Sequence, residues 1–268
     1  MQKIAILGCG WLGFPLGTKL VENQFEVSGS TTSIGKLNLF EKASIKPFLI
    51  RVSENEIHGN IQEFLQGASI LVIDIPPKLR AFNSENFVQK IQNLIPFVEQ
   101  SQIKKVLFVS STSVFADDNT IVNQSTEPSP DSESGRQLWE TEKLLQHNNQ
   151  FKTTIVRFGG LVGSDRHPAK MLAGKTNVQN PDAKINLIHQ QDCISIIENI
   201  VINNVWNKTF NAVAPYHPTR IDYYTKKAID FGLPIPEFDH SKVSLGKTVL
   251  SDNLIHDLGF QFDVVKEI

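Results

Sequence analysis

Three glycines near the start of the chain constrain its fold more than any other feature. Gly8, Gly10 and Gly13 form a G-x-G-x-x-G pattern. A short apolar run, residues 4–7, precedes the pattern, and an amphipathic run of helical spacing follows it. A strand, a glycine turn and a helix in this order are typical of a dinucleotide-binding site. The alternative is a plain glycine turn in an α/β domain that binds no ligand.

Each residue of this turn has an expected role. Gly8 permits the tight turn out of the strand, Gly10 lets a pyrophosphate approach the backbone, and Gly13 lets the helix pack closely on the sheet. The helix start, with Leu12, offers unpaired N–H groups and the positive end of a dipole to the phosphates. Trp11 could cover the pyrophosphate or anchor the helix, and the anchor is the commoner use.

Further apolar runs predict strands that alternate with helices. Strands are expected at 25–30, 47–52, 69–75, 105–110 and 153–158, and helices at 34–40, 57–65, 84–100 and 134–147. Ser84 is the expected cap of the third of these helices, which contains Pro96. Regular alternation predicts an α/β fold, a Rossmann-type doubly wound parallel sheet. Residues 116–133 are polar and are expected to form an exposed loop.

The last third of the chain is less regular. Strands are expected at 185–189 and 208–212, and Asp192, Thr219 and Ser251 are the expected helix caps. We therefore divide the chain into a dinucleotide-binding domain, residues 1–163 with contributions from about 185–212, and a small α+β substrate region, residues 164–268. This C-terminal region is expected to form a lid over the carboxyl edge of the sheet, where ligands bind in such folds.

The composition favours an ordinary globular protein. The chain has 268 residues, 40% of them hydrophobic, and a formal net charge of −2. It shows no basic run for nucleic acid and no apolar segment of membrane length, so we expect neither partner. Its two cysteines, Cys9 and Cys193, are far apart and are expected to be free thiols in the cytoplasm. No Cys/His cluster has zinc spacing, and no metal site is expected.

Several motifs in the expected order resemble the extended short-chain dehydrogenase/reductase superfamily, of the NAD-dependent epimerase/dehydratase type. Besides the glycine pattern, these are residues 109–115 (VSSTSVF), 157–163 (RFGGLVG) and 188–192 (IHQQD). The chain looks most similar to atypical members that begin Gly-Cys-Gly-Trp-Leu-Gly. The resemblance covers essentially the whole chain and implies a nucleotide cofactor and a sugar-nucleotide or similar hydroxyl or carbonyl substrate.

Members of this family use a Ser or Thr together with a Tyr-x-x-x-Lys, in which the Tyr transfers a proton. Ser111 falls at the Ser/Thr position. The alignment places Ser134 at the Tyr position and Leu138 at the Lys position, so both residues are absent. A shifted frame pairs Trp139 with Lys143, but indole is not a usable acid or base. The resemblance therefore implies the fold and the cofactor rather than tyrosine-dependent chemistry.

The residues after the second predicted strand indicate which cofactor is bound. NAD-binding folds usually carry a carboxylate there for the ribose 2′-hydroxyl, whereas this chain has Ser30, Thr31 and Thr32, with Lys36 nearby. No carboxylate occurs between Glu26 and Glu41. This favours NADP over NAD, although the hydroxyls could simply cap the next helix.

Two further cofactor contacts are predicted less directly. Pro76 follows the fourth strand and could lie by the ribose or only stop the strand. Phe158, which ends the sixth strand, is the other predicted cofactor contact.

Two functions remain open at this point. One is an NAD(P)-dependent oxidoreductase or epimerase, in which Ser111 orients the substrate. The other is a catalytically silent dinucleotide-binding sensor or scaffold. The basic residues 166–170 could face a sugar-nucleotide diphosphate, but a solvated loop is the simpler interpretation. A homodimer through helices 84–100 and 134–147 is also open, since Phe87, Ile91, Leu138 and Leu145 could form its interface or pack on the sheet.

Overall fold

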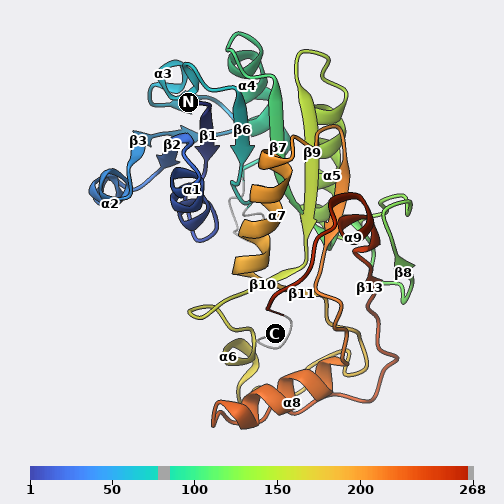
Figure 1. Ribbon diagram of the computed structural model, residues 1–268. Helices are drawn as coiled ribbons and strands as arrows, with labels where there is room; N and C mark the ends of the chain where they lie inside the picture. Colours follow the sequence, from blue (N-terminus) through green and yellow to red (C-terminus); the bar gives the residue numbers. More distant parts are fainter. Residues whose placement is uncertain (78–84, 265–268) are drawn as a thin grey trace.

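A seven-stranded parallel sheet forms the centre of the protein. The computed structural model describes residues 1–77 and 85–264 (Figure 1). The strand order is β12-β9-β7-β6-β1-β2-β3, and every neighbouring pair is parallel. The strands are β1 (Lys3–Leu7), β2 (Glu26–Thr31), β3 (Ile45–Leu49), β6 (Ile70–Ile73), β7 (Lys105–Ser111), β9 (Lys152–Phe158) and β12 (Thr209–Ala212). The predicted Rossmann-type α/β fold is confirmed.

Helices cover both faces of this sheet (Figure 1). Apolar side chains of α1 (Gly13–Glu22), α2 (Leu37–Lys42) and α7 (Gln190–Ile202) pack in one core cluster, and those of α3 (Ile61–Leu65), α4 (Phe87–Glu99) and α5 (Glu133–Gln146) in another. The short 3₁₀ helix η1 (Ile34–Lys36) leads into α2. Phe87, Ile91, Leu138 and Leu145 are all buried in the second of these clusters. They therefore pack on the sheet and do not form an exposed dimer face.

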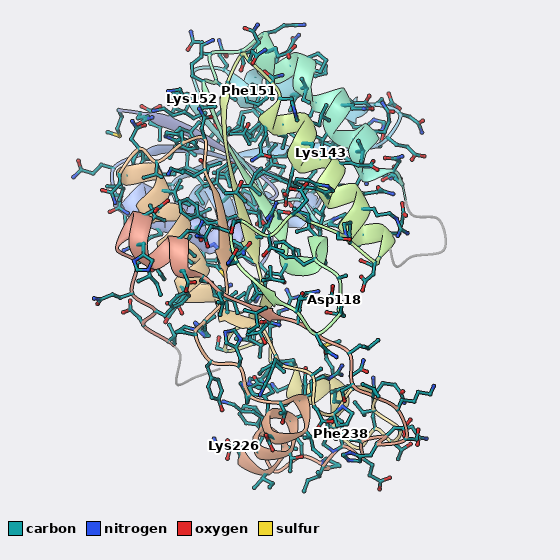
Figure 2. All side chains as sticks on the ribbon, turned by 90° about the vertical axis from the view of Figure 1, so that its right-hand side faces the viewer. Asp118, Lys143, Phe151, Lys152, Lys226 and Phe238 are labelled. Atoms are coloured by element: carbon teal, nitrogen blue, oxygen red, sulfur yellow. The ribbon has the colours of Figure 1, made fainter. Side chains whose placement is uncertain are left out.

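A smaller region lies beyond the carboxyl edge of the sheet (Figures 1 and 2). It contains the parallel pair β10 (Gly160–Val162) and β11 (Leu187–His189), with α6 (Ala169–Leu172) and α8 (Arg220–Asp230). A small apolar cluster around Val162 and Tyr223 holds it together. None of the helices in the described part of the chain has the length and apolar character needed to span a membrane.

Two predicted boundaries differ from the structure. The third strand begins earlier, at Ile45, and the chain then forms a short hairpin of β4 (Arg51–Val52) and β5 (Ile57–His58). The loop at 116–133 follows the 3₁₀ helix η2 (Thr112–Val114) and contains β8 (Ile121–Val122), which pairs with the distant β13 (Thr248–Val249). Val122 is consequently buried.

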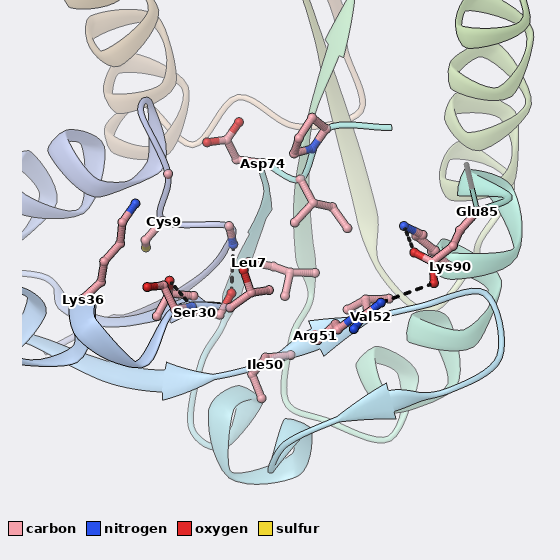
Figure 3. A pocket seen from close by; sticks show the side chains of 17 residues that line it. Leu7, Cys9, Ser30, Lys36, Ile50, Arg51, Val52, Asp74, Glu85 and Lys90 are labelled. Atoms are coloured by element: carbon pink, nitrogen blue, oxygen red, sulfur yellow. Dashed lines mark hydrogen bonds and ion pairs between the residues drawn. The ribbon is translucent and has the colours of Figure 1, made fainter. Parts of the chain in front are cut away.

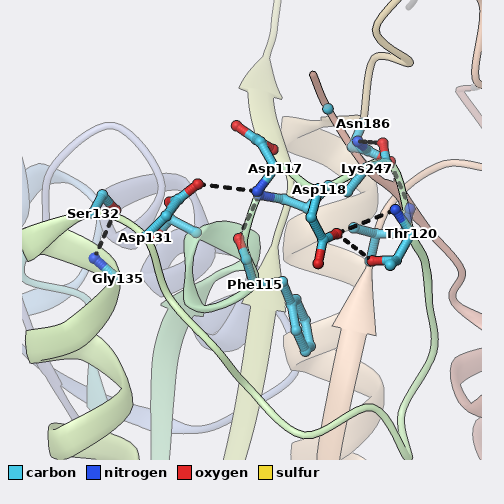
Figure 4. A network of polar contacts seen from close by, with 12 residues as sticks. Phe115, Asp117, Asp118, Thr120, Asp131, Ser132, Gly135, Asn186 and Lys247 are labelled. Carbon is cyan, nitrogen blue, oxygen red and sulfur yellow. Dashed lines mark hydrogen bonds and ion pairs between the residues drawn. The ribbon is translucent and has the colours of Figure 1, made fainter. Parts of the chain in front are cut away.

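Lys247 holds this loop in place (Figure 4). Its Nζ donates to the carbonyl oxygen of Phe115 at 2.6 Å and to Asp117 Oδ1 at 2.8 Å. On the other side, Asn186 Nδ2 donates to the Lys247 carbonyl oxygen at 2.9 Å. The residues after β7 are therefore fixed by a segment from near the end of the chain.

The helix caps were predicted with mixed success. Thr219 caps α8 as predicted, since its side chain accepts the N–H of Asp222. The prediction for Asp192 is wrong, because His189 caps α7. Asp192 is instead buried in the first turn and accepts the N–H of Asp263 at 3.1 Å.

Two further caps differ from expectation. Ser251 precedes α9 (Asp252–Leu258), but its hydroxyl bonds to the backbone of Val213 and does not cap the helix. Ser84 lies outside the described residues, and Asn86 caps α4. Pro96 lies inside α4 as predicted.

Candidate functional site

A cleft of about 670 Å³ opens over the glycine turn at the carboxyl edge of the sheet (Figure 3). It combines the ends of β1, β2 and β6 with the β4 hairpin and the start of α4. It is lined by Leu7, Gly8, Cys9, Gly10, Ser30, Thr31, Thr32, Ser33, Lys36, Ile50, Arg51, Val52, Asp74, Ile75, Pro76, Glu85 and Lys90. The sequence-predicted residues Gly8, Gly10, Ser30, Thr31, Thr32, Lys36 and Pro76 are among them.

The three glycines of the turn are required for different reasons. Gly8 has a φ of +105°, and a Cβ there would lie 2.4 Å from the carbonyl oxygen of Asp74. A Cβ on Gly13 would lie 2.3 Å from the carbonyl oxygen of Gly8. A Cβ on Gly10 would meet nothing within 4 Å. The packing of the protein thus explains Gly8 and Gly13, whereas Gly10 leaves open space next to the cleft.

The turn is fixed mainly by Ser30 at the end of β2. Ser30 Oγ accepts the N–H of Gly8 at 2.9 Å, and the Ser30 carbonyl oxygen accepts the N–H of Cys9 at 2.8 Å. The N–H groups of Trp11 and Leu12 have no acceptor among the described residues. Two backbone donors therefore remain at the start of α1, where an anion would be stabilised.

Charged residues line both walls of the cleft. Lys36 lies on one side, and Arg51 with Glu85 and Lys90 on the other (Figure 3). Lys90 Nζ lies 2.6 Å from Glu85 Oε2, and this hydrogen bond holds the pKa of Glu85 below its usual value. An Arg51 Nη lies 4.0 Å from Glu85 Oε1. The Glu85 carboxylate is therefore balanced by neighbouring cations, and Lys36 is not part of this group.

Asp74, which directly follows β6, was not predicted. Its carboxyl accepts the N–H of Gly13, the first residue of α1. Burial raises the pKa of this carboxyl to about 8, against the opposing effect of the Gly13 hydrogen bond. Asp74 stands directly after the carboxyl end of β6, and Arg51 opens β4 shortly after β3 ends. Position after a sheet strand is the signal that could have identified them.

Trp11 joins the glycine turn to the smaller region. Its Nε1 donates to Asp165 Oδ1 at 2.8 Å, and its carbonyl oxygen accepts from Gln190 Nε2 at 2.6 Å. The Arg166 guanidinium lies over its ring at 5.1 Å. A Cβ on Gly163 would lie 2.7 Å from the same ring. Trp11 therefore serves as an anchor.

A second cavity, of about 370 Å³, includes Gly163, which packs against the Trp11 ring. It is lined by Val162, Gly163, Ser164, His167, Lys170, His189, Phe231 and Leu233. His167 packs edge-on against Phe231 and parallel to Tyr223, whose Oη lies 3.4 Å from His167 Nε2. Burial, followed by nearby lysines, lowers the pKa of His167. The cavity thus combines an apolar wall with imidazole, hydroxyl and ammonium groups.

Residues expected at the catalytic positions lie apart from both cavities. Ser111 ends β7, and its Oγ accepts the N–H of Ser113 at 3.2 Å. Ser134 lies in the first turn of α5, and Leu138 is buried in the core at 3% exposure. Phe158 is likewise buried in the core. The residues that the resemblance places at the Tyr and Lys positions are therefore a small hydroxyl and a core residue.

A buried ion pair lies one helical turn beyond Leu138. Arg157 contacts the Glu142 carboxylate through Nε at 3.1 Å and Nη2 at 2.6 Å, and Ser110 Oγ donates to Glu142 Oε1 at 2.5 Å. The Arg157 guanidinium also lies over the rings of Phe115 and Trp139. Sequence reasoning placed Arg157 in a motif but missed its partner.

No group of three or more His, Cys, Asp and Glu side chains in residues 1–77 and 85–264 is placed to hold a metal ion. Cys9 and Cys193 are both free and buried.

Comparison with solved structures identifies the fold. A putative NAD-dependent epimerase/dehydratase from Methylobacillus flagellatus superposes with a TM-score of 0.77 at 21% identity, over 99% of this chain and 95% of that one. UDP-glucuronic acid 4-epimerase from Bacillus cereus, solved in complex with NAD, gives 0.81 at 17% identity, over 98% and 92%. The fold is therefore that of NAD-dependent epimerases/dehydratases and short-chain dehydrogenases/reductases.

Comparison of sequences gives a closer relationship. No family model matches the chain. The Escherichia coli K-12 protein YeeZ is 33% identical over 266 residues, which cover 98% of this chain and 96% of that protein. The alignment covers nearly the full length of both proteins at this identity. The chain therefore belongs to the family of the E. coli protein YeeZ.

Proposed function

We propose that the cleft over the glycine turn binds a nicotinamide dinucleotide. The observation that carries this proposal is the pair of unpaired N–H groups, of Trp11 and Leu12, beside the open space at Gly10. A pyrophosphate seated there would accept both N–H groups and face the positive end of α1. Ser30 would act through the turn that it holds, and Pro76 would border the ribose. The B. cereus structure with NAD has the same fold.

We further propose that NADP is preferred over NAD. Lys36 and Arg51 supply two cations to the cleft that Thr31 and Thr32 line, Lys36 from one wall and Arg51 from the other (Figure 3). The one carboxylate on that wall, Glu85, is neutralised by Lys90 at 2.6 Å. A 2′-phosphate would gain charge-assisted hydrogen bonds there.

The reaction we favour is oxidation, reduction or epimerisation of a sugar nucleotide or a similar hydroxyl or carbonyl compound. A bound nicotinamide supplies hydride transfer. The second cavity, which includes Gly163 beside the Trp11 ring, would hold the substrate. Ser111 lies outside this cavity and would not contact a substrate held there. His167 and His189 line this cavity, and an imidazole can both accept and donate a proton. They would provide the proton transfer that the absent Tyr-x-x-x-Lys provides in similar proteins.

A catalytically silent sensor or scaffold is the second candidate. One observation favours it, namely that Leu138, which the resemblance aligns with the catalytic lysine, is a core residue. A sensor needs the dinucleotide site alone, so the two candidates differ only in the use of the second cavity.

Calorimetric titration with NADP(H) and NAD(H) tests the site. We expect Gly10→Ala to weaken binding by at least about 100-fold, because its methyl group would occupy the space of the pyrophosphate. Gly35→Ala is the matched control, since a Cβ on Gly35 also meets open space and Gly35 does not line the cleft. Equal affinity for both variants would refute the proposed phosphate site.

Turnover separates the two candidate functions. With NADPH and a panel of sugar nucleotides and aldehydes, the enzyme proposal expects activity that falls about 100-fold or more in His167→Asn, with dinucleotide affinity unchanged. Tight dinucleotide binding without turnover across the panel would favour the sensor.

The other predictions about partners and location remain open to test. A homodimer, a cytoplasmic location and the lack of a nucleic-acid or membrane partner are proposals here. Light scattering of the purified protein measures its oligomeric state directly.

A further inference from the structure

Asp74 occupies an unusual place in the candidate dinucleotide site. Its carboxyl accepts the N–H of Gly13 at the start of α1, and its Oδ2 lies 3.1 Å from where a Cβ of Gly13 would be. It lines the same cleft as Gly8 and Gly10 (Figure 3). A side-chain carboxyl therefore lies at the start of α1, where the proposed dinucleotide would place its pyrophosphate.

No cation in residues 1–77 and 85–264 forms an ion pair with this carboxyl. Besides burial, Asp74 in turn raises the pKa of two neighbouring thiols, those of Cys9 in the glycine turn and Cys193 on α7. Burial raises the pKa of Cys9 to about 12 and that of Cys193 well above its usual value, so both thiols stay neutral near pH 7. Lys36 is the cation that lines the cleft from the side of β2.

A charged carboxylate and a pyrophosphate would repel each other at this helix end. Two anions that share one site cannot both remain ionised without a large cost. The pyrophosphate remains charged at neutral pH, so the carboxyl is the group that can hold a proton. A protonated carboxyl has an O–H to donate, and a phosphate oxygen is a strong acceptor for it.

We propose that Asp74 binds the dinucleotide as a neutral carboxylic acid, donating a hydrogen bond to a pyrophosphate oxygen, so that cofactor binding requires one bound proton. This inference rests on the proposed dinucleotide site and adds a ligand to it. The burial that raises the pKa of Asp74 to about 8 in the free protein supports it, because the proton is then present at neutral pH.

The proposal fixes the sign and size of a pH effect. Below the pKa of Asp74 the free protein already holds the proton, and affinity is independent of pH. Above it, each binding event must take up a proton, so affinity falls tenfold for each pH unit. NAD⁺ is the appropriate probe because it has no 2′-phosphate that titrates near neutral pH.

The experiment is a calorimetric titration with NAD⁺ between pH 6 and pH 10, at constant ionic strength, in buffers of different ionisation enthalpy. We expect uptake of about one proton on the alkaline side and none at pH 6. Asp74→Asn retains an N–H donor and cannot titrate, so its affinity should stay within about twofold across the range. Glu85→Gln, which removes the other carboxyl of the cleft, is the control and should keep the pH dependence of the unmodified protein.

Each outcome decides a different point. Binding of the unmodified protein that is independent of pH, with no proton uptake, would overturn the role of Asp74 while leaving the dinucleotide site intact. A slope that persists in Asp74→Asn would assign the proton to another group. No binding of NAD⁺ or NADP⁺ at any pH would overturn the proposed function and this inference together. The proton count needs only the unmodified protein, so the test survives if Asp74→Asn fails to fold.

Discussion

Removing Glu142 should destabilise the protein more than any single surface change. The Glu142 and Arg157 side chains are 0% and 4% exposed. Arg157 donates to the carboxylate through Nε at 3.1 Å and through Nη2 at 2.6 Å, and Ser110 adds a bond at 2.5 Å. Glu142→Ala would remove the acceptor of all these bonds and leave the guanidinium charge buried among the rings of Phe115 and Trp139.

The magnitude follows from this burial. Breaking a buried ion pair by removing one partner costs about 3–5 kcal/mol, because the remaining charge is uncompensated. Total stability of a domain is about 5–15 kcal/mol, so Glu142→Ala should lower the free energy of unfolding by a large fraction. Replacing both partners by apolar residues of similar size, Glu142→Leu with Arg157→Met, should recover most of that loss, because no buried charge remains.

Urea unfolding followed by tryptophan fluorescence measures these differences. Lys226→Ala is the control, because its pair with Asp230 is solvent-exposed and should contribute less than about 0.5 kcal/mol. A loss below about 1 kcal/mol for Glu142→Ala would contradict the argument from buried charge. So would a double variant as unstable as the single one.

Three more predictions follow from the site. Gly13→Ala should prevent folding or reduce stability severely, because its Cβ would lie 2.3 Å from the Gly8 carbonyl oxygen; circular dichroism and thermal melting check this. Lys36→Ala and Arg51→Ala should each weaken NADP⁺ binding about tenfold and NAD⁺ binding little, because each would remove a charge-assisted hydrogen bond to the 2′-phosphate; parallel titrations with both nucleotides measure the ratio of the two affinities. Between pH 4 and pH 8 the folded protein keeps a proton on Asp74 that the unfolded chain has lost, since folding raises its pKa from 3.8 to about 8. Stability should therefore fall by about 4 kcal/mol between pH 5 and pH 8 relative to Asp74→Asn, which urea midpoints at these two pH values would show.

Local patterns in the sequence predicted most of the sheet. The apolar runs located β1, β6, β7 and β9 within a few residues, because a strand buried on both faces reads as a continuous apolar run. The glycine pattern located the turn because the requirement for glycine is also local. Backbone atoms facing Gly8 and Gly13 leave no room for a Cβ.

The charged part of the candidate site could not be predicted in this way. Arg51, Asp74 and Glu85 lie on separate segments, and only the fold brings them into one cleft. Likewise, nothing near Asp192 in the sequence shows that Asp263 would approach it and leave the helix cap to His189. Pairings over long sequence separations leave no local periodicity to detect.

The anchoring of the loop at 116–133 has a consequence for the order of folding during synthesis. Lys247 bonds to the Phe115 carbonyl 132 residues earlier in the chain, and β13 pairs with β8 in the same loop. A ribosome would release this loop long before it makes the segment that holds it. Chains begin to fold from the N-terminal side as they emerge, so we expect the loop to stay unanchored until residues 247–249 have been made. The emergence of Lys247 and β13 would then decide when the residues after Ser111 take up their final arrangement.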